Sequence, residues 1–573
     1  MSLRSDRWFQ HPSKETRFQH LSAMRANGHV PESFVGKPII GIFNSWSDLN
    51  SCNAPHKELV EFVKRGVLLA GGYPLEMHTI TTPADFMKPS DLPYRNLMAM
   101  DVEETIRALP IDGAVMLCEC DKTTPAQLMG AASSNIPTLQ LAAGHRASGS
   151  FRGKKVNYGT DLWKLMDDYN AGLMSEEEWK ELEKCISCTQ GGCPVMGTSS
   201  TMKCVSEVLG MMLPNTSTIP ATHASRKWAA EETGKRIVSM VKEGLTPSRL
   251  MTEAAFDNAI KLLAALGGST NAVIHLTAIA GRLGISIPLK RYEELSANVP
   301  ILVNLQPSGE HSMDDFFEAG GLGSVINKLL PELDATCLSA LGTTLEESYR
   351  HYESFRDDII YSVDEPYKTE AGIAVLTGNL APSGAILKRA ASSFINGKHR
   401  GKAIVFDSYE EMHEIIDSEE LEVDETSILV LRNCGPVGEG MPEWGALPIP
   451  KKLLKQGVRD MVRISDARMS GTSYGTNILH VSPEAQLGGP IAAIRTGDWI
   501  EVNLEESTLN VELTETEINE RMKDWAPVRL HKRGFMKLHT DHVLQADEGC
   551  DLDFLRPKTK EEVIFIEPTV GRG

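Results

Sequence analysis

Residues 112–132 read D-G-A-V-M-L-C-E-C-D-K-T-T-P-A-Q-L-M-G-A-A. The small and apolar run at 113–118 is typical of a buried strand, and the segment 126–132, which follows a polar turn, has the composition of a helix. The same unit recurs upstream, where the run P-I-I-G-I-F at 38–43 precedes helical periodicity at 56–70. A strand that ends in a polar loop and leads into a helix is the repeating unit of a parallel sheet.

Further strands and helices complete this pattern. A strand at 75–80 precedes a helix at 97–108. A fourth strand is expected at 136–142, after the strand and helix of residues 112–132. Because strands and helices alternate at this spacing, we predict a mainly parallel sheet with right-handed crossovers.

The texture of the sequence changes twice along the chain. The region from about 160 to 350 is mostly helical, with helices expected at 200–212, 226–243, 253–264 and 271–283. From about residue 370, turns rich in Gly, Pro and Asn separate short β-rich segments at 372–377, 403–406, 427–431 and 499–502. We therefore predict an α/β fold with an N-terminal parallel-sheet domain, 1–380, and a C-terminal β-rich, barrel-like domain, 381–573.

Composition restricts the classes of function. The 573 residues are 41% hydrophobic and carry a formal net charge of -19. This length is ample for a large core, and the negative charge makes nucleic acid or an anionic membrane surface an unfavourable partner. No apolar run approaches the roughly 20 residues that span a bilayer, and the polar N-terminus lacks the apolar core of a secretory signal. We expect a cytoplasmic protein.

Three polar loops hold cysteines. They read N-S-W-S-D-L-N-S-C-N (44–53), C-E-C-D-K-T-T-P (118–125) and C-I-S-C-T-Q-G-G-C-P-V-M-G-T (185–198). Two of them follow predicted strands, whose carboxyl ends are where ligands gather in open α/β sheets. Thiolates select iron–sulfur clusters or zinc, whereas Asp121 is a hard ligand suited to a divalent cation. Adjacent soft and hard ligands predict two different metals at one site.

Other cysteines have a simpler interpretation. Ten cysteines are too few for a disulfide scaffold in a chain this long. A lone cysteine is more often a small buried hydrophobe, which is the role we expect for Cys118, Cys204, Cys337, Cys434 and Cys550. The C-x-x-C pair of Cys185 and Cys188 would by spacing suggest zinc or redox work, but no second matching pair exists.

Three further motifs suggest ligand binding. The stretch M-V-R-I-S-D-A-R-M-S-G-T-S-Y-G-T at 461–476 either folds its backbone around a ligand or forms a polar turn. A Gly/Pro loop at 435–443 carries two carboxylates. The segment G-G-S-T-N-A from Gly267 is typical of a helix N-terminus, which either holds a carboxylate through free N–H groups or is capped by Ser269 or Thr270.

Together these motifs resemble the dihydroxyacid/phosphogluconate dehydratase family over nearly the whole chain. C-D-K-T-T-P, G-G-S-T-N, N-C-G-P and S-D-A-R-M-S-G-T are specific in combination and occur in matching order. The stretch from 112 to 133 and N-L-Q-P-S-G-E look closest to the sugar-acid branch, whose members dehydrate aldonates such as arabinonate, xylonate or galactonate. The resemblance implies a hydro-lyase that converts a 2,3-dihydroxy sugar acid to a 2-keto-3-deoxy acid.

The resemblance also implies cofactors and assembly. An iron–sulfur cluster with one iron open to substrate would be held by Cys52, Cys120 and Cys193, and three ligands in this branch favour [2Fe–2S] over [4Fe–4S]. The expected assembly is a homodimer or a dimer of dimers, and the expected partner is a small sugar-acid substrate.

Magnesium and the catalytic base follow from the same resemblance. The magnesium ligands would correspond to Asp121, a carbamylated Lys122 and Glu443. Ser470, which closes S-D-A-R-M-S, would be the base, with Lys122 as a second catalytic residue and Thr472 helping to seat the substrate carboxylate. A serine becomes a usable base near pH 7 only beside a cation, which makes its alkoxide accessible.

Two positions depart from the family pattern. The family places a further acidic magnesium ligand about ten residues before Y-R-N-L, and this position falls on Ala84 here. Its neighbour Asp85 would substitute after a one-residue shift; otherwise water fills the position or magnesium binds weakly. Cys188, near Cys193, would offer a fourth thiolate.

Other functions remain open at this point. The related dihydroxyacid dehydratase of valine and isoleucine synthesis is one alternative, and Ala84 motivates another, a catalytically impaired or regulatory relative. A zinc hydrolase would also use Cys, Asp and Glu, but it would normally show a tight His-bearing motif, whereas the 16 histidines are scattered.

Overall fold

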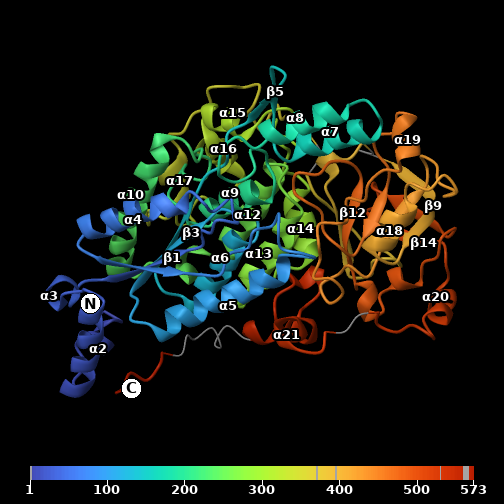
Figure 1. Ribbon diagram of the computed structural model, residues 1–573. Helices are drawn as coiled ribbons and strands as arrows, with labels where there is room; N and C mark the ends of the chain where they lie inside the picture. Colours follow the sequence, from blue (N-terminus) through green and yellow to red (C-terminus); the bar gives the residue numbers. More distant parts are fainter. Residues whose placement is uncertain (1–2, 370–371, 394–396, 529–530, 559–566, 573) are drawn as a thin grey trace.

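A parallel sheet organises the N-terminal part of the chain (Figure 1). The computed structural model describes residues 3–369, 372–393, 397–528, 531–558 and 567–572. The sheet has the order β2-β1-β3-β4, and every pairing in it is parallel. Its strands are β1 (Ile39–Asn44), β2 (Tyr73–His78), β3 (Gly113–Cys118) and β4 (Thr138–Ala142). The predicted parallel α/β domain is thus confirmed, because each apolar run forms a strand.

Helices cover both faces of this sheet. The connections between successive strands are α4 (His56–Leu69), α5 (Leu92–Ala108) and α6 (Thr123–Ser134). α4 packs closely against α10 (Ala224–Glu243), because the two helices meet at Gly66 and Gly234. A Cβ atom on Gly66 would overlap the carbonyl oxygen of Glu231, so only glycine allows this approach. α5 and α6 pack together below the sheet in Figure 1.

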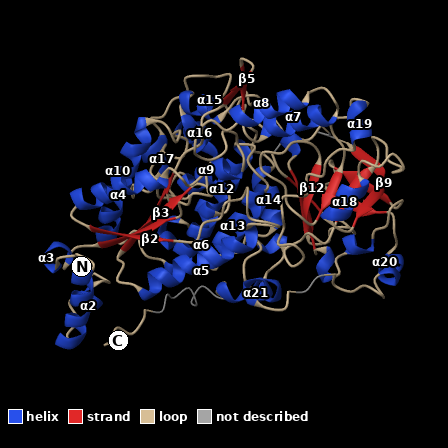
Figure 2. Cartoon of the chain, in the orientation of Figure 1, coloured by secondary structure: helices blue, strands red, loops and turns tan. Residues whose placement is uncertain are grey.

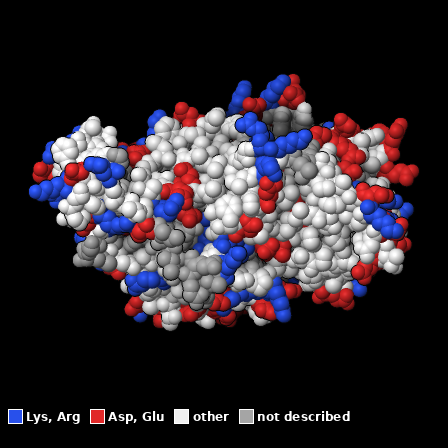
Figure 3. Space-filling view, turned by 90° about the horizontal axis from the view of Figure 1, so that it is seen from below, with Lys and Arg blue, Asp and Glu red and all other residues white. Residues whose placement is uncertain are grey.

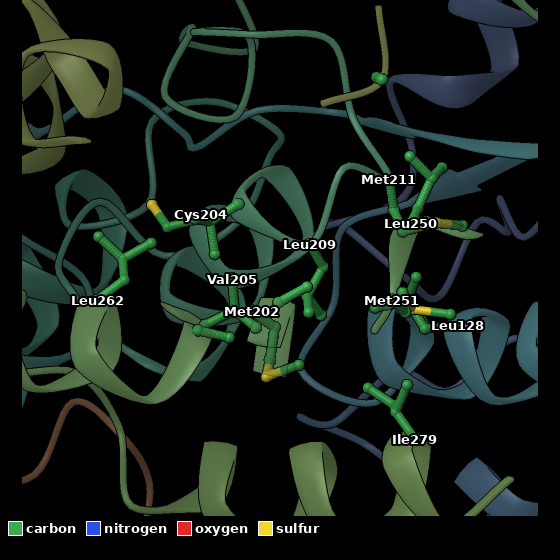
Figure 4. Close-up of a cluster of buried hydrophobic side chains, with 14 of the residues drawn as sticks. Leu128, Met202, Cys204, Val205, Leu209, Met211, Leu250, Met251, Leu262 and Ile279 are labelled. Atoms are coloured by element: carbon green, nitrogen blue, oxygen red, sulfur yellow. The ribbon is translucent and has the colours of Figure 1, made fainter. Parts of the chain in front are cut away.

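The middle of the chain supplies the helical core. The predicted helices are found as α9 (Thr198–Val208), α10, α12 (Glu253–Ala265) and α13 (Asn271–Arg282). Figure 4 shows side chains of several helices meeting in one apolar cluster, among them Leu128 of α6, Met202 of α9 and Leu262 of α12. Cys204 lies in this cluster, as predicted for a core cysteine. Burial of these faces is the main favourable term in folding.

The C-terminal part forms a mixed eight-stranded sheet with the order β14-β13-β9-β10-β11-β12-β8-β7, drawn in red at the right of Figure 2. Its strands are β7 (Ala374–Leu376), β8 (Gly384–Leu387), β9 (Lys398–Phe406), β10 (Ile428–Leu431), β11 (Arg463–Ser465), β12 (Asn477–Ser482), β13 (Trp499–Asn503) and β14 (Thr508–Val511). The two edges meet, since Thr377 donates to Ser507 and Leu509 donates to Thr377 through the backbone. The sheet is therefore barrel-like, as predicted.

The domain boundary predicted at 380/381 stays a prediction, although β7 already belongs to the C-terminal sheet. The last part of the chain returns to the N-terminal domain through α21 (Gly534–His542) and the segment after it. There Arg95 donates to the carbonyls of Gly549 and Cys550, and Arg282 forms a buried ion pair of 2.6 Å with Asp551. These contacts tie the segment at 549–551 to the helices α5 and α13 of the N-terminal domain.

The surface carries charges of both signs. On the face seen in Figure 3, acidic and basic side chains are interspersed. Among the described residues, none of the helices combines the length and apolar character that crossing a bilayer requires.

Candidate active site

A cavity of about 570 Å³ lies where loops of the two domains meet. The N-terminal domain contributes the loops after β1, β2 and β3 and the helix α7 (Thr160–Asn170), and the C-terminal domain contributes segments near 443–449 and 463–474. This volume is in the range of sites for small molecules. Among the residues predicted to be functional, those that line it are Cys52, Asp85, Cys120, Asp121, Cys193, Glu443, Ser470 and Thr472.

Three thiols, those of Cys52, Cys120 and Cys193, form what we call the thiol cluster. All three line the cavity. The Cys120 loop is held to the Cys52 loop by Asn53, whose side-chain oxygen accepts from the Cys120 N–H at 3.2 Å and whose amide donates to Thr123 at 3.1 Å. The hydrogen bond with Cys52, together with burial, raises the pKa of Cys120 well above its usual value. Without a metal, Cys120 is therefore a neutral thiol.

A cation lies beside the thiol cluster. Arg146, just beyond the carboxyl end of β4, directs Nη2 at Cys52 Sγ from 3.9 Å and donates to Ser51 Oγ at 3.1 Å. Its guanidinium stacks over the Tyr158 ring, 4.8 Å from the centroid. Burial, followed by the neighbouring Cys52, raises the pKa of Cys193. Arg146 would stabilise thiolates once a metal displaces their protons.

A buried ion pair fixes the position of Glu119, the residue before Cys120. Glu119 and Lys203 are fully buried and form an ion pair of 2.5 Å. Glu119 also accepts from the Gly144 N–H at 2.8 Å and from Ser199 Oγ at 2.9 Å. Burial opposes ionisation of Glu119, but Lys203 and these donors together lower its pKa. The loop between β3 and α6 is thus tied to β4 and α9.

Three carboxylates surround Lys122, and we call Asp91, Asp121 and Glu443 the carboxylate cluster. Lys122 Nζ lies 3.4 Å from Asp91, 4.0 Å from Asp121 and 3.8 Å from Glu443. The amine is fully buried and does not line the cavity, and within the part of the chain that the structure describes it has these ion pairs but no hydrogen bond. Burial is the main cause that raises the pKa of Asp121 to about 7, with Glu443 and Asp91 adding to it.

A second buried cation joins the carboxylate cluster. Arg468 pairs with Asp91 at 2.5 Å and also with Glu443. The three residues of the carboxylate cluster are therefore accompanied by two cations, Lys122 and Arg468, in or beside the cavity wall. Such an arrangement would lose its charge balance if Lys122 were converted to an anionic carbamate, and a divalent cation would offset that loss.

Asp85 lies apart from this cluster. Its carboxylate accepts from the Tyr158 hydroxyl at 3.1 Å. Within the described parts of the chain it makes no ion pair with Lys122 or Arg468, the two cations of the carboxylate cluster. Its role as a cation ligand stays a prediction that this position does not favour.

The predicted base lies in the loop after β11. Ser470 Oγ is 2.9 Å from Thr472 Oγ1, and the Thr472 N–H also points to Ser470 Oγ at 3.4 Å. The indole N–H of Trp163 donates to Thr472 Oγ1 at 2.9 Å. Either hydroxyl can donate in the Ser470–Thr472 hydrogen bond. Because an indole can only donate, Thr472 Oγ1 accepts from Trp163 and keeps its own proton for a second partner, so Ser470 Oγ can accept from Thr472.

The G-G-S-T-N segment fixes this loop in place. Ser269 Oγ accepts from the Asn271 N–H at 3.2 Å, whereas Thr270, the N-cap residue of α13, makes no side-chain capping bond. Asn271 donates to the Met469 carbonyl and to Thr198 Oγ1, each at 3.0 Å. A Cβ atom on Gly471 would lie 2.5 Å from the Thr198 nitrogen, so the loop packs directly on the start of α9. The segment is buried and acts by holding the Ser470 loop.

Comparisons with known proteins agree with this geometry. The N-terminal domain model of dihydroxy-acid/6-phosphogluconate dehydratases matches residues 37–348, and the C-terminal domain model matches residues 358–550. The chain belongs to this dehydratase family. It is accordingly a hydro-lyase.

The relatives place this dehydratase within the family. An L-arabonate dehydratase of Azospirillum brasilense is 46% identical, with 96% of this chain and 97% of that protein covered. A 6-deoxy-6-sulfo-D-gluconate dehydratase of Pseudomonas putida is 43% identical, with 97% and 96% covered. A dihydroxy-acid dehydratase of Thermodesulfovibrio yellowstonii is 36% identical, with 94% and 98% covered. The dehydratase thus belongs to the sugar-acid branch.

The remaining cysteines lie outside the cavity. Those predicted to be core residues are all buried, namely Cys118, Cys204, Cys337, Cys434 and Cys550. Cys188 is exposed and its thiol donates to the carbonyls of Ala147 and Ser148. It does not line the cavity, so its position does not favour a fourth thiolate.

Sequence reasoning missed several residues of the site. Arg468 was within the quoted motif S-D-A-R-M-S, and its charge beside a predicted magnesium site was an available signal. Arg146 follows the predicted fourth strand, where ligands gather. Asp91 and Trp163 gave no such signal, because their roles depend on contacts between distant segments.

The residues present fit the cofactors that the family implies. Among the described residues, no three His, Cys, Asp or Glu side chains already converge as in a formed ion site. On the carboxylate side, the ammonium of Lys122 is buried and lies 3.4–4.0 Å from all three carboxylates. Among the described residues it has these ion pairs but no hydrogen bond, and carbamylation would replace the cation by an anionic oxygen ligand of the type that Mg²⁺ takes. Soft donors on one wall and hard donors on the next suit two metals.

Proposed function

We propose that this dehydratase removes water from a sugar acid with hydroxyls at C2 and C3, giving a 2-keto-3-deoxy acid, and that it depends on an iron–sulfur cluster and Mg²⁺. The observation that carries the proposal is that the thiol cluster, the carboxylate cluster and Ser470 meet at one cavity. The identity of 43–46% to dehydratases named for sugar acids supports the substrate class.

The cofactors would be held by different walls of the cavity. Cys52, Cys120 and Cys193 would hold the cluster, with [2Fe–2S] favoured by the resemblance to the sugar-acid branch. Asp121, a carbamylated Lys122 and Glu443 would hold Mg²⁺. When bound, iron supplies a Lewis acid for the departing hydroxyl and magnesium stabilises negative charge on the substrate.

Ser470 would take the proton from C2. The proton goes to Ser470 Oγ, which Thr472 holds by a hydrogen bond of 2.9 Å. Because the Thr472 hydroxyl is engaged with Ser470 and Trp163, its role in seating the substrate carboxylate, as first predicted, would be secondary to orienting the base. Loss of the C3 hydroxyl leaves an enol, which becomes the ketone without further help from the protein.

The cavity lining is mixed. It presents the polar groups of Asn50, Tyr158, Asp167 and Asn170, three of them already paired with protein groups, and apolar side chains that include Leu162, Trp444 and Ile449. The polar groups offer partners for the hydroxyls of a sugar acid. A site built to pair hydroxyls discriminates strongly against an analogue that lacks them, because its polar groups are left unpaired. The alternative substrate, 2,3-dihydroxyisovalerate, offers only two hydroxyls.

The test is a panel of aldonic acids and 2,3-dihydroxyisovalerate, assayed anaerobically with Mg²⁺ for release of keto acid. We expect turnover of one or more aldonates. Turnover of dihydroxyisovalerate alone would contradict the substrate class, and a brown protein inert on every acid would favour the impaired relative. We also propose a homodimer or dimer of dimers in the cytoplasm, which light scattering checks for the assembly.

A further inference from the structure

Asp91 occupies an unusual place for an aspartate at the start of a helix. It is the N-cap residue of α5, where an aspartate normally accepts hydrogen bonds from the first turn, yet its side chain makes no such bond. It is buried, with 3% of its surface exposed. The adjacent Ser90 donates to the carbonyl of Gly440, which ties this turn to the C-terminal domain. Its carboxylate is therefore turned away from the helix and into the site.

The two oxygens of Asp91 have different partners. Oδ1 pairs with Arg468 at 2.5 Å, whereas the buried Oδ2 forms an ion pair of 3.4 Å with Lys122 Nζ. Within the described parts of the chain, neither Oδ2 nor Lys122 Nζ has a hydrogen bond. If Lys122 were modified and lost its positive charge, Oδ2 would be a buried anionic oxygen in need of a new cationic partner, and a divalent cation would supply one.

Asp85, the residue next to Ala84 in sequence, does not have these properties. Its carboxylate accepts from Tyr158, on the wall that also carries Arg146 and the thiol cluster. Asp91, in contrast, pairs with Arg468, which also pairs with Glu443. Asp85 is thus the aspartate nearest to Ala84 in sequence, whereas Asp91 is the aspartate that lies beside Lys122 in the structure.

We infer that Asp91 supplies the acidic ligand for the divalent cation that position 84 lacks, so that the cation site of this chain comprises Asp91, Asp121, Glu443 and the modified Lys122. The inference rests on the proposed function, because it assumes that a divalent cation binds at this wall. The acidic ligand that the family carries at position 84 would thus be supplied from position 91, seven residues later in the sequence. A carboxylate oxygen is a ligand of the type Mg²⁺ takes.

The experiment is titration of the iron-loaded protein with Mn²⁺, a paramagnetic substitute for Mg²⁺, with free Mn²⁺ measured by electron paramagnetic resonance. We expect the D91N variant to bind Mn²⁺ at least ~10-fold more weakly than the wild type. The matched D85N variant should bind within about twofold of wild type. Adding A84E to D91N should restore much of the affinity, because the family position then carries its carboxylate, beside Cys120.

The outcomes separate this inference from the proposed function. Unchanged Mn²⁺ affinity in D91N, or an equal loss in D85N, overturns the inference while magnesium binding stands. A wild-type protein that keeps its iron yet binds no Mn²⁺ overturns the magnesium part of the proposed function, and the inference with it. If D91N does not fold, D91E, which keeps a charge for Arg468 but moves the carboxylate, is titrated instead, with weaker binding expected and wild-type affinity as the contradicting result.

Discussion

The two walls of the cavity hold their charges in different ways. On one wall, among the described residues, Arg146 is the cation beside the thiol cluster, at 3.9 Å from Cys52. On the other wall the carboxylate cluster surrounds Lys122 and pairs with Arg468. The thiol wall therefore offers thiols that become anions on binding a metal, whereas the carboxylate wall holds its carboxylates in ion pairs.

This difference determines what each wall requires of a metal. Metal binding requires the thiolate forms and releases their protons, so the role of the thiol wall begins when a metal is loaded. The carboxylate wall keeps its shape through ion pairs even without a metal. Substitution of a cysteine in the thiol cluster should therefore abolish binding of the iron–sulfur cluster. Substitutions near the carboxylates and Ser470 should instead lower the rate or the stability by amounts that differ from residue to residue. The predictions below test that contrast, from the largest expected effect to the smallest.

The largest effect is expected at the thiol wall. Cys120→Ser should lose nearly all iron and visible absorbance, and with them turnover, because a hydroxyl is a poor substitute for a soft thiolate. Iron analysis and the absorbance spectrum after anaerobic purification check this. The matched control is Cys188→Ser, which removes an exposed thiol outside the cavity and should keep the colour. A colourless Cys188→Ser protein would show that the cluster uses a fourth thiolate.

The next effect concerns the base. Ser470→Ala should stay folded and coloured and still bind a divalent cation, yet lose on the order of 10²–10⁴ in rate, or more if no group substitutes. It should also fail to exchange the C2 hydrogen of substrate with deuterated solvent. Ser473→Ala is the control, since Ser473 lines the same cavity but its hydroxyl is not part of the chain from Trp163. Exchange at the wild-type rate in Ser470→Ala would mean that another group is the base.

A smaller effect is expected for the residues that orient Ser470. Thr472→Val removes the hydrogen bond to the base and should lower kcat by about 10–100-fold, the value of a bond to a charged group. Trp163→Phe removes only the donor to Thr472 and should cost about 5-fold. Loss of a hydrogen bond to the base disfavours its deprotonated form. In both variants the acidic limb of the kcat–pH profile should therefore move to higher pH, whereas a purely structural change would lower kcat equally at all pH values.

The smallest effect concerns pH and stability. In the metal-free protein, burial raises the pKa of Asp121 to about 7. The folded state then keeps a proton that the unfolded state loses near pH 4, so stability should fall as pH rises from about 4 to about 7. Asp121→Asn should flatten this decline, by on the order of 1–3 kcal/mol in unfolding free energy. Denaturant unfolding with chelator, at pH 5 and 8, measures it; equal slopes in both proteins would contradict the assignment.

The two walls also differ in how far they could be predicted from sequence. The thiols of the cavity were predictable, because each lies in a polar loop and two of those loops follow apolar strands whose spacing is a local property. The strands of the N-terminal sheet were predictable for the same reason, and in the C-terminal sheet so were β7, β9, β10 and β13, whereas β8, β11, β12 and β14 were not predicted. The barrel closure and the carboxylate wall depend on tertiary contacts. The sequence favoured Asp85 as a cation ligand because it is the neighbour of Ala84. In the structure, however, Asp91 is the aspartate beside Lys122, and Asp85 bonds to Tyr158.

The central claim is that one cavity binds an iron–sulfur cluster at its thiol wall and a divalent cation at its carboxylate wall. The most direct measurement is metal and acid-labile sulfide analysis of the anaerobically purified protein, after equilibration with Mn²⁺ and removal of the unbound ion. We predict iron and sulfide in equal amounts, together with one bound Mn²⁺ per cluster. Zinc without sulfide, or iron and sulfide without any retained Mn²⁺, would contradict the account.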